Sequence, residues 1–315
     1  MNVATRLIRQ PWLWAWVGAF AVWLATATFT HGRGSAEVLS AAMTFGAFFV
    51  IVALGQMFVI TLGPGNVDLS IPACMTLAGT VSMKTMDGSA GMIPVGLALA
   101  VGIGAGVGAA NYALIRLLRI PPIIATLSSS FIFQSAAIWW NRGLRVKPPE
   151  QLADFTTAKI AGVPLIAVVV ILIAIAGHFL LTRTVYGRSV VAIGQNMRAA
   201  HLAGVKVERI RAATYVMCAM LAGLCGYLLS GFSGGAALNM GEEYLLSSIA
   251  VVVIGGSSVA GGFANVPGLW GAALFLFLLV TMLNTFGAGA GVRLVLTGLI
   301  IIGVIVAASG GKSRT

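Results

Sequence analysis

Residues 38–62 read VLSAAMTFGAFFVIVALGQMFVITL, and the chain continues as Gly63-Pro-Gly-Asn-Val-Asp-Leu-Ser-Ile-Pro72. The first stretch is apolar almost throughout and, as an α-helix, is long enough to cross a hydrocarbon core about 30 Å thick. The second stretch contains two prolines and two glycines, which interrupt helices. Together they predict a membrane-spanning helix followed directly by a break in regular structure, with the polar Asp68 inside the break.

The composition of the whole chain agrees with a membrane location. Of its 315 residues, 59 % are hydrophobic and 9 % are charged, against about 25 % charged residues in soluble proteins. A water-soluble globule of this size could not cover so much apolar surface, so the surrounding medium must be membrane lipid. We predict an all-α, polytopic integral membrane protein that forms a single transmembrane domain over residues 1–315. Cys74, Cys218 and Cys225 lie in apolar runs and are predicted to be small buried side chains.

The apolar runs predict about ten membrane segments. The third run is too short to cross upright and follows the break, so it is predicted to be either re-entrant or the continuation of a broken helix. The first is interpreted as an uncleaved span, because it is longer than the apolar part of a signal peptide. The ten segments are 12–30, 38–62, 67–82, 90–117, 122–140, 163–181, 210–233, 244–262, 267–286 and 292–308.

The net charge of +11 would suggest nucleic acid as a partner in a soluble protein, but its distribution indicates membrane orientation instead. If all ten segments cross, most basic residues fall on one face, where Glu208 is the only acidic residue. That face is predicted to be cytosolic, with both termini inside, and no nucleic-acid partner is expected. Its basic residues are Arg6, Arg9, Arg116, Arg119, Arg183, Arg188, Arg198, Lys206, Arg209, Arg211, Lys312 and Arg314.

Two connections between segments are long enough to do more than join helices. The periplasmic connection, residues 141–162, suits either a docking surface for an external partner or a solvated linker, and both interpretations stay open. The cytosolic connection, residues 182–210, contains Tyr186-Gly-Arg188 and Gly194-Gln-Asn-Met-Arg-Ala-Ala200.

Short patterns that resemble enzyme motifs are incomplete. Gly310-Gly-Lys-Ser313 resembles the end of a phosphate-binding loop, but the required earlier glycine is Val306. Gly231-Phe-Ser-Gly234 resembles an intramembrane serine-protease motif, but no histidine follows it. We predict neither enzymatic activity nor a cofactor or metal site. The glycine pairs Gly102/Gly106 and Gly104/Gly108 are predicted to be helix-packing surfaces.

Ionisable groups inside the predicted segments are scarce, and Asp68 is the main one. Ion-coupled carriers usually need several such groups at mid-membrane. Asp68 or Ser70 could cap a half-helix with Pro72 in its first turn, which would be a structural function. Alternatively, the break could direct polar groups into a water-filled path. Both interpretations stay open at this point.

Several motifs occur in an order that resembles the permease subunits of ribose-type sugar ABC importers. They are Thr61-Leu-Gly63, Val67-Asp-Leu-Ser70, Ile123-Ile-Ala-Thr-Leu127, Tyr186-Gly-Arg188, Gly194-x-Asn-x-x-Ala-Ala200 with Gly204-Val205, and Ile249-Ala-Val-Val-Val-Ile-Gly-Gly-Ser-Ser-Val-Ala-Gly-Gly262. The resemblance implies a bacterial inner-membrane subunit, a second permease subunit, a periplasmic solute-binding protein and cytosolic ATP-binding subunits. It also implies that residues 194–205 form a coupling helix, although the loop could also be a basic topology anchor alone. The coupling residues are Gly194, Asn196, Arg198, Ala199, Ala200 and Gly204.

The chain departs from the family pattern at the break, which is longer and contains more proline, and at Leu245 and Gln134, where the family often has an acidic residue and an arginine. The solute expected is monosaccharide-like. A branched-chain amino acid or another small metabolite remains an alternative, as does a self-sufficient secondary carrier. The predicted translocation pathway contains Asn66, Asp68, Ser70, Asn111, Thr126, Gln134 and Asn284.

Overall fold

The computed structural model describes residues 11–32, 34–141 and 146–287, together with positions 289, 291–292, 295–296, 298–299 and 302–303. Nearly all regular structure in this part of the chain is helical, and a hairpin of β1 (Lys159–Ile160) and β2 (Val163–Pro164) is the exception. The helices are α2 (Pro11–Phe29), α3 (Ser35–Thr61), α4 (Ile71–Met86), η1 (Ala90–Met92), α5 (Ile93–Leu118), α6 (Pro122–Asn141), α7 (Glu150–Thr157), α8 (Leu165–Arg183), α9 (Val185–Gln195), α10 (Met197–Leu202), α11 (Val207–Phe232), α12 (Glu242–Ile254) and α13 (Val266–Thr285).

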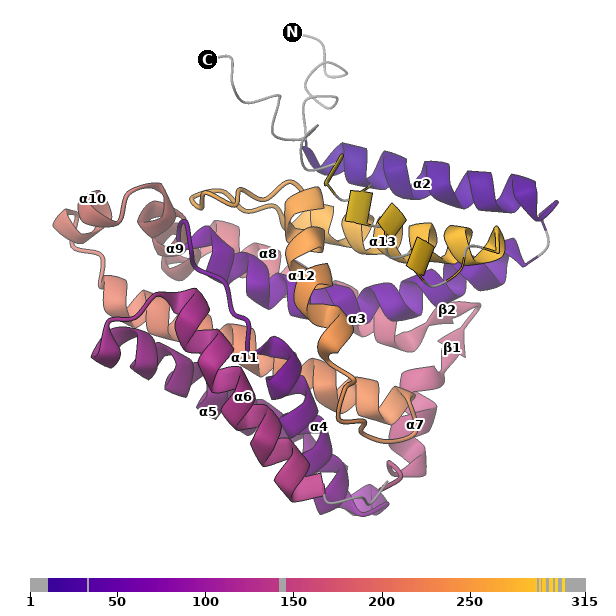
Figure 1. Cartoon of the computed structure of the whole chain (residues 1–315), viewed down its shortest axis with the longest axis horizontal. Helices are drawn as coiled ribbons and strands as arrows, with labels where there is room; N and C mark the ends of the chain where they lie inside the picture. Colours follow the sequence, from indigo (N-terminus) through magenta and orange to yellow (C-terminus); the bar gives the residue numbers. More distant parts are fainter. Residues whose placement is uncertain are drawn as a thin grey trace, which may run out of the picture.

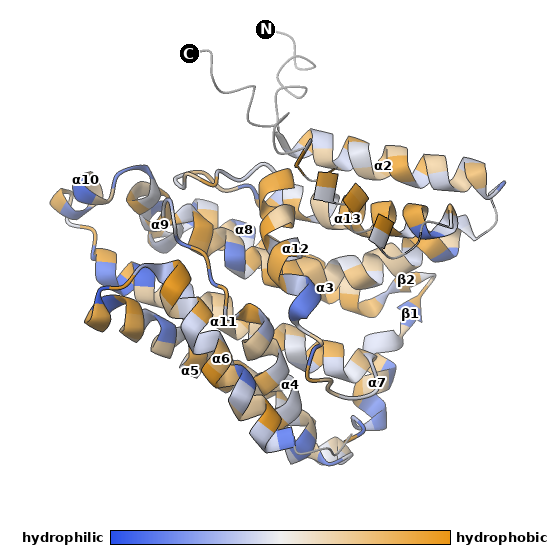
Figure 2. Ribbon diagram, viewed as in Figure 1, coloured by the Kyte–Doolittle hydropathy of each residue, from blue (hydrophilic) through white to orange (hydrophobic). Residues whose placement is uncertain are grey.

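Seven helices of the described chain are long and apolar enough to cross a membrane: α2, α3, α5 with η1, α6, α8, α11 and α13. Each coincides with a run that the sequence predicts, which confirms an all-α polytopic membrane protein. Apolar side chains along these helices are exposed to the surroundings, as expected for lipid contact, and hydrophilic residues gather at helix ends and around α10 (Figure 2). The predicted count of about ten stays a prediction: α4 and α12, with 16 and 13 residues, are shorter than these seven helices, and segment 292–308 lies mostly outside the described residues.

The eighth predicted segment, 244–262, is wrong as a continuous helix. It corresponds to α12, which ends at Ile254. Gly256, Gly261 and Gly262 have φ angles of 89°, 84° and 71°, a left-handed conformation that ends a right-handed helix. Residues 255–265 therefore form a loop, and they include four glycines, whereas α12 has none.

The third predicted segment corresponds to α4, which begins at Ile71 after the non-helical residues 62–70. Pro72 lies in its first turn, as predicted. Helix α4 does not continue the axis of α3: it runs diagonally beneath α3 and packs against α5, α6 and α11 (Figure 1). The break therefore returns the chain into the helix bundle before α4 starts.

Helix α11 forms the centre of the bundle and contacts α3, α4 and α5, while α2 and α13 pack together on the far side of α3 (Figure 1). The predicted glycine surface of α5 is confirmed at Gly104 and Gly108. A Cβ added to Gly104 would lie 2.7 Å from the Cα of Met220 on α11, and one added to Gly108 would lie 2.6 Å from the Cα of Val216. A Cβ added to Gly102 or Gly106 would meet no other atom within 4 Å, so this second pair is not part of the α5–α11 contact.

Candidate functional site

The break between α3 and α4 has few backbone partners of its own, so side chains bind its backbone N–H groups. The N–H of Asp68 donates to Oε1 of Gln56 on α3 (3.3 Å), and the N–H of Leu69 donates to Oγ1 of Thr126 on α6 (3.0 Å). The N–H of Ser70 donates to Oδ1 of Asp68 (2.8 Å). Buried backbone donors need such partners, and here they come from two helices and the break itself.

Around these bonds lies a buried polar network that joins α4, α5 and α6. The hydroxyl of Ser70 donates to Oδ1 of Asp68 (2.7 Å), and Nδ2 of Asn111 on α5 donates to Oγ of Ser70 (2.7 Å). Ser129 on α6 donates to Oδ1 of Asn111. We call this group the break cluster, and its members are Gln56, Asn66, Asp68, Ser70, Asn111, Thr126, Ser129 and Tyr215.

Asp68 is the only aspartate, glutamate, lysine or arginine that is buried among the described residues, with an exposed fraction of 0 %. The hydrogen bonds of Asp68 are made by its backbone N–H and by Oδ1. Its Oδ2 and Nε2 of Gln56 have no hydrogen-bond partner in the described part of the chain. Ser70 flanks α4 but makes no side-chain cap bond to that helix. The carboxylate therefore organises the backbone just before α4 rather than the first turn itself.

The predicted pathway residues fall into two groups. Asn66, Asp68, Ser70, Asn111 and Thr126 come together in the break cluster, where Asn66 accepts a hydrogen bond from the hydroxyl of Tyr215 (3.2 Å). Gln134 and Asn284 do not join them. Gln134 donates to the carbonyl oxygen of Leu238 (2.7 Å), and Asn284 is exposed on α13.

Sequence reasoning missed three members of the break cluster: Gln56, Ser129 and Tyr215. Gln56 is the amide side chain within the long apolar helix α3 and is 0 % exposed. A polar side chain in such a run is energetically costly in lipid and usually faces protein. The burial of Gln56 against other helices could therefore have been predicted from the sequence. Ser129 lies in the run Ser128-Ser-Ser130, and only the phase of α6 decides which of the three hydroxyls faces inward.

The motif in the predicted coupling region forms a short helix, α10, with defined ends. Asn196 caps it, because its Oδ1 accepts the N–H of Ala199 (2.9 Å). Gly204 ends the turn with a φ of 85°, and the N–H of Val205 donates back to the carbonyl oxygen of Ala200 (3.1 Å). The polar cap and the glycine therefore fix the length of the helix.

Helix α10 exposes most of its side chains. Arg198 and Ala199 are exposed, and so are Met197 and Leu202, the latter by 80 %. Ala200 is 5 % exposed and faces the rest of the chain. Of the predicted coupling residues, Asn196, Arg198, Ala199 and Gly204 are exposed and Ala200 is buried, whereas Gly194 lies outside α10, near the end of α9.

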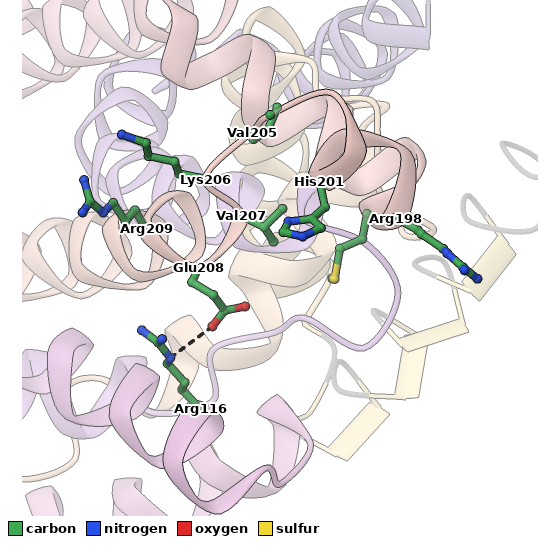
Figure 3. A pocket seen from close by; sticks show the side chains of 10 residues that line it. Arg116, Arg198, His201, Val205, Lys206, Val207, Glu208 and Arg209 are labelled. Atoms are coloured by element: carbon green, nitrogen blue, oxygen red, sulfur yellow. Dashed lines mark ion pairs between the residues drawn. The ribbon is translucent and has the colours of Figure 1, made fainter.

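A hollow of about 870 Å³ lies between α10 and the ends of α5 and α11 (Figure 3). In this view the side chains of Lys206 and Arg209 extend to one side and that of Arg198 to the other, while Glu208 points toward Arg116. The positive charges therefore surround the hollow. Its lining residues are Arg116, Met197, Arg198, His201, Gly204, Val205, Lys206, Val207, Glu208 and Arg209.

Helix α9, which precedes α10, is fastened to the bundle by Tyr186. Its hydroxyl and Oγ1 of Thr214 on α11 are 2.8 Å apart, and its ring lies 6.1 Å from that of Phe58 on α3. Burial raises the pKa of Tyr186 to about 12, although the hydrogen bond with Thr214 opposes the rise. The phenol is therefore neutral at physiological pH.

Comparison with known proteins decides the family. A model described as the permease component of branched-chain amino acid transport systems matches residues 38–305. The chain belongs to this family. The permease is thus a multi-pass inner-membrane protein, in agreement with its seven apolar helices.

The most similar proteins come from import systems. The permease is 30 % identical over 274 residues to the autoinducer 2 import system permease protein LsrC of Enterobacter sp. (strain 638), covering 86 % of this chain and 79 % of the relative. It is 32 % identical over 264 residues to the ribose import permease protein RbsC of Bacillus subtilis, covering 80 % and 78 %. The ribose import permease of Escherichia coli K12 is 28 % identical over 257 residues, covering 80 % and 79 %. These relatives confirm the resemblance to ribose-type permeases. No solved structure matches the chain.

Proposed function

We propose that the permease is the membrane subunit of an ABC importer for a monosaccharide-like solute. The observation that carries this proposal is the similarity to permeases named for ribose and autoinducer 2 import over most of both chains. In such a system the permease conducts the solute, a periplasmic binding protein delivers it, and separate ATP-binding subunits supply the energy. A second permease subunit, identical or related, completes the pathway.

Helix α10 is the proposed contact with the ATP-binding subunit. It is exposed, its ends are fixed by Asn196 and Gly204, and its charged neighbours surround a hollow. Positive charge around this region favours a partner surface that carries carboxylates, because charge complementarity directs association. With α10 on the cytosolic side, the basic residues of 182–210 obey the positive-inside rule.

The outer connection is the proposed docking surface for the binding protein. Helix α7 is held by Leu152 and Thr156, which are 4 % and 0 % exposed, and it leaves Glu150 and Asp154 exposed. A helix anchored on one face and polar on the other offers a stable surface to an external protein.

The break cluster is proposed to act by position rather than by holding the solute in this conformation. Its members are buried by protein, and a solute would have to separate α4 from α5 or α6 to reach Asp68. Alternating access supplies such a separation, because helices on the two sides of the pathway rearrange when the ATP-binding subunits close. Gln134 and Asn284 remain proposed pathway residues on other faces of the bundle.

Reconstitution of transport tests the function. The permease, its ATP-binding subunits and its binding protein are placed in liposomes, and uptake of labelled ribose and labelled leucine is followed. We expect ATP-dependent uptake of labelled ribose and no uptake of labelled leucine. Unlabelled ribose, but not unlabelled leucine, should inhibit that uptake. Leucine uptake would instead favour the amino-acid alternative. Uptake by the permease alone under a proton gradient would contradict the importer and favour a secondary carrier.

A further inference from the structure

Three segments far apart in the sequence meet at one place, which we call the glycine junction. They are Thr61–Gly63 at the end of α3, Gly194 and Gln195 at the end of α9, and Gly261 and Gly262 in the loop after α12. The N–H of Gly262 donates to the carbonyl oxygen of Thr61 (3.0 Å). Nε2 of Gln195 donates to the carbonyl oxygen of Gly262 (3.3 Å). Hydrogen bonds to main-chain carbonyl oxygens thus join the loop after α12 to the end of α3 and to the end of α9.

The glycine junction leaves no room for side chains. A Cβ added to Gly194 would collide with the carbonyl oxygen of Thr61 and the backbone nitrogen of Gly262. A Cβ added to Gly261 would lie 2.6 Å from the backbone nitrogen of Gly63, and Gly261 and Gly63 have φ angles of 84° and 123°. Main chains that touch in this way cannot slide independently, because closely packed interiors transmit displacement rather than absorb it.

The two ends of the glycine junction lead to the two functional parts of the permease. On one side, Gln195 is followed directly by Asn196, the cap of α10. On the other side, Thr61 is the last residue of α3, and residues 62–70 form the break that carries Asp68. A displacement of α10 therefore has a short route to the break through main-chain contacts alone.

We propose that the glycine junction transmits movement of α10 to the break, so that ATP-driven movement of the partner opens or closes the region of Asp68. This inference rests on the proposed function, because it assigns the part that links ATP hydrolysis to the pathway. Gly194 and Gln195 are then positioning residues for transport: they contact neither solute nor nucleotide. At Gly194, Gly261 and Gly262 the close approach of the neighbouring segments excludes a Cβ, so these three positions require glycine.

Distance measurements test the transmission directly in the permease assembled with its ATP-binding subunits in lipid. Spin labels are attached in pairs after Ala203→Cys at the end of α10, Pro64→Cys in the break, and Phe20→Cys on α2 as a reference. All three positions are exposed, while Cys74, Cys218 and Cys225 are buried. On addition of ATP with vanadate, we expect both the 203–20 and 64–20 distances to change and the 203–64 distance to stay constant. A change at 203–20 with none at 64–20 would overturn the proposal.

A variant series tests the same link by activity. Gly194→Ala should reduce ATP-dependent uptake by about tenfold or more, the scale of a typical coupling free energy, while the ATP-binding subunits still copurify and hydrolyse ATP. Gln195→Ala removes one hydrogen bond of a partly exposed side chain. It should also reduce uptake while ATP hydrolysis continues, to a smaller degree than Gly194→Ala and without loss of folded protein. Gly106→Ala is the matched control, because its Cβ would meet no atom within 4 Å.

Normal coupling in both Gly194→Ala and Gln195→Ala would exclude the glycine junction as the route. A different result is expected if the proposed function itself is wrong. The unaltered permease would then show no ATP-dependent uptake at all, and the spin-label distances would not respond to nucleotide.

Discussion

The hydroxyl of Tyr112 on α5 donates a hydrogen bond to Oε2 of Glu208 on α11, across 2.7 Å. Glu208 also lies 3.5 Å from Nε of Arg116 and 3.7 Å from Nη1 of Arg211. Tyr112 directly follows Asn111 of the break cluster. Glu208, in the first turn of α11, therefore holds the end of α5 close to α11.

Removing this carboxylate should have a modest effect on stability. The side chains of Arg116 and Glu208 are 62 % and 45 % exposed, so solvent screens the ion pair and it contributes about 0–1 kcal/mol. Glu208→Gln keeps an acceptor for Tyr112 and should shift the thermal midpoint in detergent only slightly, whereas Glu208→Ala should lower it further. Equal losses for the two variants would show that charge, and not the hydrogen bond, is what stabilises this contact.

Two variants of Asp68 distinguish its structural function from a function in transport. Asp68→Asn retains an oxygen that can accept from Ser70 and Asn111 and places no charge in this buried site, so the variant should fold. Asp68→Ala leaves buried donors unpaired, at a cost of about 1–3 kcal/mol each, and should reduce the yield of folded protein. Uptake by the folded asparagine variant then reports whether the negative charge itself is needed; unfolding of that variant would contradict this account of the cluster.

The contact between α5 and α11 should tolerate no side chain at Gly104. Gly104→Val places a branched side chain against the backbone of Ala219 and Met220, and overpacking of this kind costs about 1–3 kcal/mol or more. Gly106→Val on the same helix should be accepted, since no described atom lies near it. Thermal midpoints of the two purified variants check the difference, and a similar loss in both would point to helix propensity instead.

Helix α10 offers a matched pair of adjacent alanines. Ala199→Glu alters an exposed position and should weaken copurification with the ATP-binding subunit by about tenfold through repulsion and steric conflict, one decade being about 1.4 kcal/mol, while insertion stays normal. Ala200→Glu forces a carboxylate into a site that is 5 % exposed and should disturb the α10 turn itself. Proteolysis of the 196–206 region distinguishes the two effects; enhanced cleavage in Ala199→Glu would refute the assignment of faces.

The three thiols should not react with maleimide in the folded permease. Cys74, Cys218 and Cys225 are 0–1 % exposed and two of them lie beside backbone carbonyl oxygens. Reaction requires access as well as thiolate, so labelling should appear only on unfolding. Mass spectrometry before and after heating measures this, and rapid labelling of native protein would contradict the packing of α11.

Hydropathy predicted the seven long helices because each is apolar over a full membrane thickness. It failed at 255–262, where the run Gly-Gly-Ser-Ser-Val-Ala-Gly-Gly follows an apolar helix and glycines with left-handed φ angles end that helix. Asp68 could be recognised as important from its place in the break. Asn111 and Thr126 were predicted to lie on the same pathway, but Gln56, Ser129 and Tyr215 were missed, because only the packing of α3, α6 and α11 brings them to the break.

In the predicted coupling region, too, the sequence alone does not determine which of two neighbouring residues faces outward. The pattern Gly-x-Asn-x-x-Ala-Ala predicts a short helix, and the structure has one. Which alanine faces outward depends on where the cap places the first turn, and Asn196 sets that phase by binding the N–H of Ala199. The glycines at 63, 194 and 262 were visible as motifs, but their mutual contact depends on the tertiary fold.

The break also has a consequence for how the permease is made. The backbone N–H of Leu69 depends on Thr126, and the side chains of Asp68 and Ser70 depend on Asn111; these two partners lie 57 and about 41 residues later in the chain. During synthesis, α3 and the break leave the ribosome before these partners exist, and unsatisfied polar groups are costly in lipid. We therefore expect the nascent break to stay in a hydrated environment until α5 and α6 have been made.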